Sequence, residues 1–90
     1  MNNVVNRIDE TSLTVSATIN VGTNPNACVF DGRYVWIANR GSNSVMQIDP
    51  SSNTVINTYT VGNTPEDIVF DGTDLWVSNN GDGTLSEIAP

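Results

Sequence analysis

The stretch PNACVFDGRYVWIAN, residues 25–39, returns as PEDIVFDGTDLWVSN, residues 65–79, with every equivalent residue shifted by forty positions. Each copy consists of two short apolar runs joined by Asp-Gly, at positions 31–32 and 71–72. Asp-Gly tolerates the positive φ angles of a tight hairpin turn. The stretch therefore predicts a β-hairpin that recurs along the chain.

The repeat extends over the whole chain. Residues 11–50 and 51–90 are identical at sixteen of forty positions without a gap, and residues 1–10 correspond to 41–50 and to 81–90. A period near forty residues, with about four strands in each unit, is what a β-propeller blade requires. We therefore expect an all-β chain with two blade repeats of 40 residues, units 11–50 and 51–90, and a partial extra repeat at 1–10.

Hydrophobic patterning distinguishes a propeller blade from a sandwich. Residues 27–30 and 34–38 are continuous apolar runs, as in a sheet that is covered on both faces. Residues 13–21 and 54–61 alternate with Thr, Ser and Asn, as expected for an outer strand half in water. We expect blades of four antiparallel strands, ordered from inner to outer as 26–31, 34–39, 44–49 and 54–61. The other predicted strands are 4–9, 13–21, 66–71, 74–79 and 84–88.

Composition excludes several function classes. The 90 residues carry a net charge of -7, with Arg7, Arg33 and Arg40 as the only basic residues, so nucleic acid binding is not expected. The chain has no His and a single cysteine, Cys28, so we expect no zinc site, no other metal or cofactor, and no internal disulfide. The residues after Met1 show neither a signal peptide nor a membrane span. We expect a soluble chain without a membrane partner, in a compartment that the sequence leaves open.

Residues 29–65, VFDGRYVWIANRGSNSVMQIDPSSNTVINTYTVGNTP, resemble the repeat of the YVTN/NHL-like β-propellers, a group that includes virginiamycin B lyase-like proteins. The resemblance covers essentially the whole chain, and it implies a propeller fold and a bacterial secreted, periplasmic or surface parent protein. Virginiamycin B lyase-like enzymes depend on a catalytic His, and this chain has no residue to receive that role. The resemblance therefore implies the fold and not the lyase activity.

Two blades do not close a ring, because propellers close with about four to eight blades and an isolated pair leaves apolar faces in water. We expect homo-oligomerisation by head-to-tail contacts, as a homotrimer with six blades or a homotetramer with eight. Blade 24–62 would be complete within the chain, and the second blade, 64–88, would be completed by strand 13–21 of a neighbouring chain. Strands 4–9 and 84–88 correspond to the same strand of the repeat, so in a ring both would occupy one strand position. The sequence does not decide between them. An excised fragment of a longer propeller and an engineered chain stay open as well.

The aromatic residues of the strands are expected in the core rather than in a site. Trp36 and Trp76 lie mid-strand among apolar residues, which favours packing between blades over a stacking platform for a sugar or base. Phe30 and Phe70 have the same pattern. Cys28 lies in an apolar strand without a His to activate it, and is expected to be a buried small hydrophobic residue.

The polar residues that recur in both repeats have local explanations. Asp31 and Asp71 are expected to serve their turns, and Asn39 and Asn79 to hydrogen-bond nearby backbone. Without His, no Ser or Cys triad can be assembled, so we expect no catalytic residue and no enzyme activity.

The remaining candidates lie in the loops of one face of the ring. We expect a non-catalytic, self-assembling scaffold; the alternative is a multivalent, lectin-like module that binds a small polar ligand or glycan through these loops. Repeated carboxylates at Glu66 and Asp67 could also hold a cation at the channel mouth. The candidate ligand-binding residues are Thr23, Asn24, Asn26, Arg40, Ser42, Asn43, Asn63, Thr64, Glu66, Asp67, Asn80 and Asp82.

Overall fold

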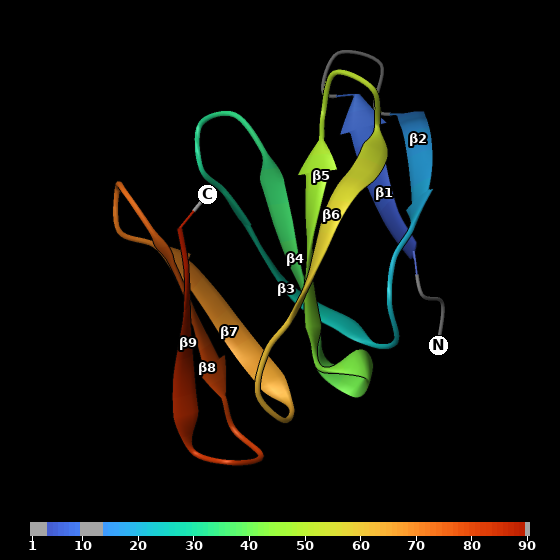
Figure 1. Cartoon of the computed structure of the whole chain (residues 1–90). Helices are drawn as coiled ribbons and strands as arrows, with labels where there is room; N and C mark the ends of the chain where they lie inside the picture. The colour runs from blue at the N-terminus through green and yellow to red at the C-terminus, as the bar shows by residue number, and fades with distance from the viewer. Residues whose placement is uncertain (1–3, 10–13, 90) are drawn as a thin grey trace.

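The computed structural model describes residues 4–9 and 14–89 of the chain, which form three antiparallel sheets (Figure 1). Residues 1–3, 10–13 and 90, which belong to the predicted partial repeat and to the ends of the predicted units, lie outside the described residues. No helix in the described part of the chain is long and apolar enough to cross a membrane. The elements are β1 (Val4–Asp9), β2 (Thr14–Asn20), β3 (Pro25–Phe30), β4 (Val35–Asn39), the 3-10 helix η1 (Arg40–Ser42), β5 (Ser44–Asp49), β6 (Thr54–Thr60), β7 (Pro65–Phe70), β8 (Leu75–Asn79) and β9 (Thr84–Ile88).

The predicted strands are all present in the described part of the chain, with ends that differ by at most one residue. Strands β3, β4, β5 and β6 form one four-stranded antiparallel sheet in sequence order, which confirms the predicted order. Strands β7, β8 and β9 repeat the first three positions of that sheet, and β1 and β2 form a two-stranded sheet. The register repeats as well, since Val29 pairs with Trp36 as Val69 pairs with Trp76.

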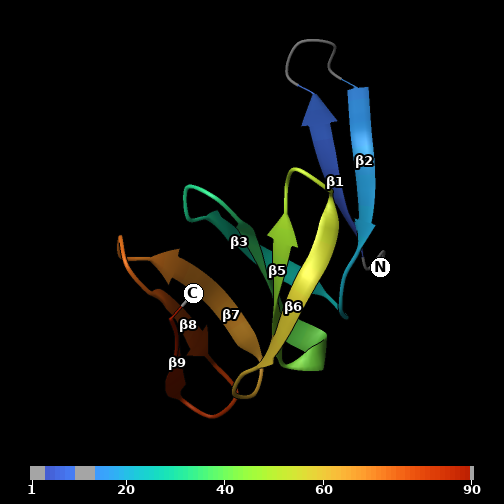
Figure 2. The same ribbon diagram turned by 45° about the horizontal axis from the view of Figure 1, so that its top comes forward.

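Two apolar layers cover the two faces of the four-stranded sheet. Strand β3 lies beside β7, and the sheet β7–β9 covers one face, while the hairpin β1–β2 stands on the other side (Figure 2). On the hairpin side, Ile37 and Ile48 of the sheet pack with Ile19 of β2. This double coverage explains why the middle strands are apolar on both faces. The layer between the two larger sheets contains Trp36, Ala38, Val45, Ile68, Leu75, Val77 and Ile88.

Two core predictions are wrong for the single chain. Trp36 is fully buried, as predicted, and Phe70 packs against the core. Phe30, however, is 58% exposed, and Cys28 is exposed too. The reason is local coverage: Ile37 and Ile48 pack with the hairpin, whereas the side of β3 that carries Cys28 and Phe30 stays open to solvent.

The hairpin between β3 and β4 is held by its aspartate. Asp31 Oδ1 accepts hydrogen bonds from the backbone N–H groups of Arg33 (2.8 Å) and Tyr34 (2.7 Å), and its Oδ2 accepts one from the Trp36 indole Nε1 (2.8 Å). Gly32 in this turn has φ of 99°, in the region that favours glycine. The Asp-Gly turn is therefore joined to the core tryptophan five residues later.

The second hairpin repeats this arrangement. Asp71 accepts hydrogen bonds from the backbone N–H groups of Thr73 (2.8 Å) and Asp74 (2.7 Å) and from the Trp76 indole (2.7 Å). These hydrogen bonds stabilise the charged carboxylate and lower the pKa of Asp71. At Asp31, partial burial raises the pKa. The hydrogen bonds from the backbone N–H of Tyr34, the Trp36 indole and the backbone N–H of Arg33 outweigh this effect, so the pKa is lowered overall.

The paired asparagines behave differently from the prediction. Asn39 and Asn79 are buried, and their side-chain amides donate to hydroxyls of the next strand rather than to backbone. Asn39 Nδ2 lies 3.2 Å from Ser44 Oγ, and Asn79 Nδ2 lies 3.3 Å from Thr84 Oγ1 and 2.9 Å from Ser86 Oγ. Each asparagine therefore ties the second strand of its sheet to the third.

Candidate functional site

The loops at one end of the sheets are tied to one another by backbone hydrogen bonds. Arg40 N donates to Asn24 O and Gly41 N donates to Thr23 O, both at 2.9 Å. The equivalent residues forty positions later make the same pair of bonds, from 80 to 64 and from 81 to 63, again at 2.9 Å. The loop that enters each sheet is thus fixed to the turn that follows its second strand.

This close approach of two loops requires glycine. A Cβ added at Gly41 would lie 2.7 Å from Thr23 Cγ2, and one at Gly81 would lie 2.7 Å from Thr64 Oγ1. Both distances are below normal contact, so the glycine shared by the two repeats is explained by space. Thr64 has φ of 55°, which is unusual for a β-branched residue.

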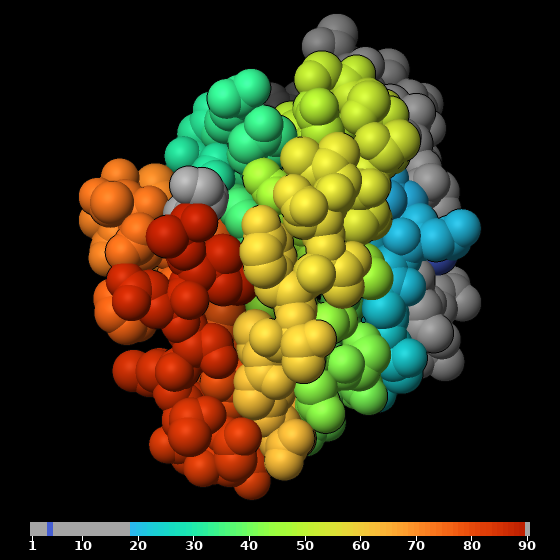
Figure 3. Space-filling view, in the orientation of Figure 1, coloured from blue at the N-terminus to red at the C-terminus, as the bar shows by residue number. Residues whose placement is uncertain are grey.

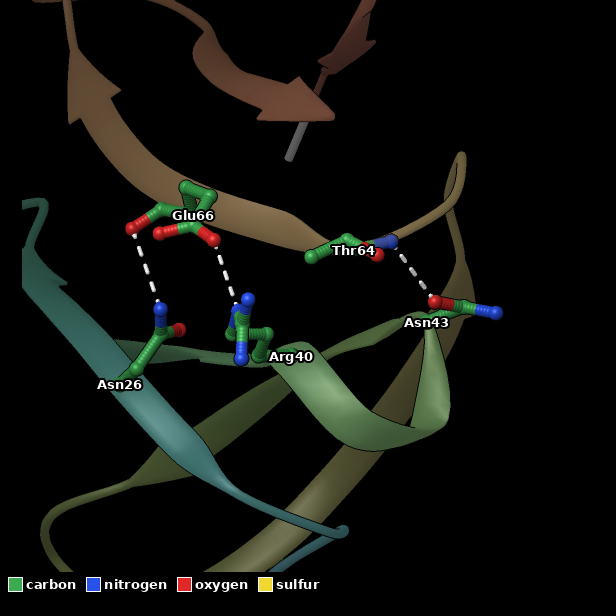
Figure 4. A network of polar contacts seen from close by, with 5 residues as sticks. All are labelled: Asn26, Arg40, Asn43, Thr64 and Glu66. Carbon is green, nitrogen blue, oxygen red and sulfur yellow. Dashed lines mark hydrogen bonds and ion pairs between the residues drawn. The ribbon is translucent and has the colours of Figure 1, made fainter. Parts of the chain in front are cut away.

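Side chains connect the two larger sheets at this end (Figure 4). Arg40 of η1 forms an ion pair with Glu66 of β7, with 2.7 Å between Nε and Oε1. Asn26 Nδ2 donates to the Glu66 carbonyl at 3.4 Å, and Asn43 Oδ1 accepts from the backbone N–H of Thr64 at 2.9 Å. Thr64 has an unusual backbone conformation, and its N–H group is therefore held by a side chain of the preceding repeat.

These contacts surround an open polar hollow of about 490 Å³ between the two repeats. Its lining offers amide, hydroxyl and backbone groups and one guanidinium, but no aromatic ring. The Arg40 side chain is half exposed even though it is paired with Glu66. Such a lining suits hydrogen bonding to a polar ligand. The lining residues are Asn24, Arg40, Gly41, Asn43, Asn63, Thr64 and Gly81.

The predicted site residues fall into three groups. Asn24, Arg40, Asn43, Asn63 and Thr64 line the hollow. Asn26 and Glu66 form the contacts between sheets, beside the hollow. The remaining predicted residues lie outside it: Thr23, Ser42, Asp67, Asn80 and Asp82.

The acidic candidates have local partners. Asp82 accepts hydrogen bonds from Thr84 Oγ1 (2.5 Å) and from the backbone N–H of Asn63 (3.1 Å), and these bonds lower its pKa. Asp67 accepts from the backbone N–H of Ile68 at 2.9 Å. Within the described residues, no group of three His, Cys, Asp or Glu side chains could hold a metal ion. The carboxylates at this end thus take part in turns and an ion pair of the single chain.

Sequence reasoning identified the loops but missed the ion pair between Arg40 and Glu66. The repeat gave no signal for it, because the equivalent residues are Asn80 and Asn26. It also missed the glycines of the lining, although their recurrence at 41 and 81 could have indicated a tight approach.

The fold and this loop arrangement define an all-β protein whose antiparallel sheets resemble the blades of a β-propeller. Kuenenia stuttgartiensis hydrazine synthase, a β-propeller-containing protein, is similar in structure, with a TM-score of 0.87 and 25% sequence identity over 97% of this chain. A functionally unknown protein from Desulfotomaculum acetoxidans is similar with a TM-score of 0.65 and 27% identity over 96% of this chain. The chain spans 26% and 34% of the lengths of those two proteins. No family model matches the chain, and no curated protein matches it either.

Proposed function

We propose that the chain is a non-catalytic structural module whose sheets assemble with those of further copies into a closed propeller of six or eight blades. The observation that carries this proposal is a difference in burial between equivalent residues of the two repeats. Val45 is completely buried, whereas its equivalent Leu85 is 68% exposed. The chain thus carries this apolar sheet face twice, once in each repeat. Only the copy in the first repeat is covered by another sheet of the same chain.

The first uncovered face belongs to the sheet β7–β9. In the four-stranded sheet, the equivalent face carries Trp36, Ala38 and Val45, which are all fully buried beneath the next sheet. In β7–β9 the corresponding face carries Leu85 and Val69, which is 52% exposed. Exposed apolar area of this kind marks an interaction surface.

The second uncovered surface is the β3 part of the other face of the four-stranded sheet, beside the area that the β1–β2 hairpin covers. Ile68 of β7 is only 4% exposed because it packs between the sheets, while its equivalent Cys28 is exposed. Phe30 is 58% exposed, and a hollow of about 380 Å³ lies next to Cys28 and is lined also by Ala27 and Ile37. One chain therefore has two different open faces, each equivalent to one half of the contact between its own sheets.

Two different complementary faces favour a head-to-tail assembly, which closes into a ring where the rotation allows it. The internal contact between the two larger sheets is the template for the contact between copies. The absence of His from the chain agrees with a role that involves no Ser or Cys triad. The activity named for hydrazine synthase is that protein's own, and only the blade arrangement supports the proposal.

Native mass spectrometry and light scattering test this proposal. We expect a particle of three or four times the 9.7 kDa chain mass. Leu85→Arg, on the open face, is expected to give a folded single chain. Ile56→Arg is the matched control, because Ile56 is also exposed (42%) but is the extra residue of the β5–β6 bulge and lies in β6, not in β3 or β7–β9. A folded monomeric wild-type chain at high concentration would refute the proposal.

The polar hollow favours a second candidate function, the binding of a small polar ligand or glycan in several copies around the ring. Its lining groups match hydroxyl-rich ligands through hydrogen bonds, and Arg40 adds a charged donor. A glycan array probed with the folded assembly should give hits that Asn43→Ala abolishes. Asp67→Asn, outside the hollow, serves as the control, and an array without hits counts against this candidate.

A further inference from the structure

We propose that the free edge of β9 receives β2 of a second copy of this chain, and that β1 is the strand that gives up its place. This inference rests on the proposed assembly and specifies how two copies join. Strand β9 pairs with β8 on one side, and no strand of the described residues pairs with its other side. Figure 3 shows β9, in red, at the surface of the molecule. Unpaired backbone groups along such an edge are a template for another strand.

The repeat identifies which strand fits this edge. Strand β6 is the fourth strand of the complete sheet, and β2 lies forty residues before it. The β1–β2 pairing reproduces the β5–β6 pairing, since Val5 is opposite Ile19 as Val45 is opposite Tyr59. The register shift recurs too, at residues 7/8 in β1 and at 47/48 in β5. Strand β2 therefore already has the backbone register that a fourth strand needs.

The same register can be written for β2 against β9. In the β5–β6 template, residue 45 is opposite residue 59 and residue 47 is opposite residue 57. Shifting β5 forward by forty and β6 back by forty places Leu85 opposite Ile19 of the second copy and Glu87 opposite its Ala17. The pairing would complete a four-stranded sheet of β7, β8, β9 and the added β2.

Strands β1 and β9 both occupy the third position of the repeat, and Asn79 decides between them. This side chain is 1% exposed and donates to Thr84 Oγ1 and Ser86 Oγ of β9. Strand β1 has Val4 and Asn6 at those positions, so the hydroxyls would be missing if β1 lay beside β8. A buried amide would then lose both hydroxyl acceptors, and only the side-chain oxygen of Asn6 could replace one of them. Strand β9 therefore stays in its sheet.

The turn before β9 also favours its retention. Gly83 N donates to Asn79 O at 2.9 Å, and Asp82 binds Thr84 through both its backbone N–H and its hydroxyl. Displacing β9 would break these bonds together with the burial of Ile88, which is 7% exposed in the core. When two copies join, β1 of the incoming copy separates from β2 of that same copy. Strand β9 of the receiving copy then forms the backbone hydrogen bonds with β2 that β1 made before.

Disulfide trapping distinguishes the two arrangements. Two double-cysteine variants are made in a Cys28→Ala background: Ala17→Cys with Glu87→Cys, and Ala17→Cys with Arg7→Cys. The register places 17 opposite 7 within one chain, and the proposal places 17 opposite 87 of another copy. Residues directly opposite in antiparallel strands lie within disulfide range. Circular dichroism first verifies that both variants are folded, and native mass spectrometry gives their assembly state.

We expect the assembled 17/87 variant to form disulfides between chains on mild oxidation, seen as linked multimers on a non-reducing gel and as a 17–87 peptide by mass spectrometry. In the assembled 17/7 variant, the fraction of chains that form the internal 17–7 disulfide should be at least tenfold smaller than the fraction linked between chains in the 17/87 variant. An assembled protein in which 17/7 links fully and 17/87 does not would overturn this inference while leaving the proposed assembly intact. Monomeric protein by native mass would overturn both.

Discussion

Replacing Asp31 by Ala should cost more stability than the same change at the equivalent Asp71. Asp31 accepts three hydrogen bonds, and one of them comes from the indole of Trp36, which is completely buried. Loss of the carboxylate leaves that indole N–H without its partner, at about 1–3 kcal/mol. The two turn amides can bond to water instead, at about 0.5–1.5 kcal/mol each. We therefore expect a total of about 2–6 kcal/mol for Asp31→Ala.

At the second hairpin the three hydrogen bonds have the same lengths within 0.1 Å, but Trp76 is only half buried. Its indole N–H can reach water when the carboxylate is removed, so Asp71→Ala should cost less than Asp31→Ala. The two sites share the Asp-Gly dipeptide, the strand register and the turn geometry. They therefore form a matched pair in which burial of the tryptophan is the main difference.

Urea unfolding followed by far-UV circular dichroism measures both variants, since tryptophan fluorescence would be altered directly by the substitutions. The comparison is made in the Leu85→Arg background, which is expected to keep the chain single. With an m-value of about 1–3 kcal/mol/M, a difference of about 1 kcal/mol from the indole alone separates the midpoints by roughly 0.3–1 M. Equal midpoints for Asp31→Ala and Asp71→Ala would refute the argument from indole burial. Asp31→Asn, which keeps one acceptor oxygen, should fall between wild type and Asp31→Ala.

Three further outcomes can be checked with the same protein. Because hydrogen bonds hold the pKa of Asp31 below its usual range in the folded chain, their stabilisation is complete above about pH 4 and is lost as the pH falls further. In a plot of unfolding free energy against pH, Asp31→Asn should therefore reduce the loss of stability below about pH 4. An unchanged loss would contradict this. Thr64→Asn should raise stability by about 1 kcal/mol in urea unfolding, because Asn tolerates the positive φ that Asn24 adopts at the equivalent position; a loss of stability would show that the threonine makes a compensating contact. A hydrogen bond with Asp74 and the like charges nearby raise the pKa of Glu87, which lies exposed on the open face of β7–β9. Covering that face disfavours the charge further, so lowering the pH, or Glu87→Gln at neutral pH, should shift light scattering toward the assembled state. A pH-independent assembly would count against burial of this face.

The strands were predictable because two independent signals coincide at each of them. Apolar runs fix where the strands lie, and Asp-Gly or Pro-containing turns fix where they end, so the errors are no larger than one residue. The bond between Asp31 and Trp36 had a signal in the sequence, the same spacing of five at 71 and 76. Recognising it requires the register of the hairpin, which brings the turn carboxylate within reach of the indole.

Burial was less predictable, because it depends on what covers a residue and not on the residue itself. Cys28 and Phe30 have the apolar character of core residues, yet they lie on the part of β3 that the hairpin leaves open. At the candidate site, the loops followed from the order of strands in a blade. The pair between Arg40 and Glu66 did not, because it occurs once and breaks the repeat.

The covered sheet of the first repeat shows how the sheet of the second repeat should be buried after assembly. Trp36 is covered by a following sheet and Trp76 is not, although both hydrogen-bond to the aspartate of their own hairpin. If a second copy covers β7–β9 as β7–β9 covers the four-stranded sheet, Trp76 becomes buried in the same way. Water then no longer reaches either indole, and the cost of Asp71→Ala rises toward that of Asp31→Ala. Convergence of the two costs in the assembling chain, with a persistent gap in the Leu85→Arg background, would locate the contact between copies on this face independently of any mass measurement.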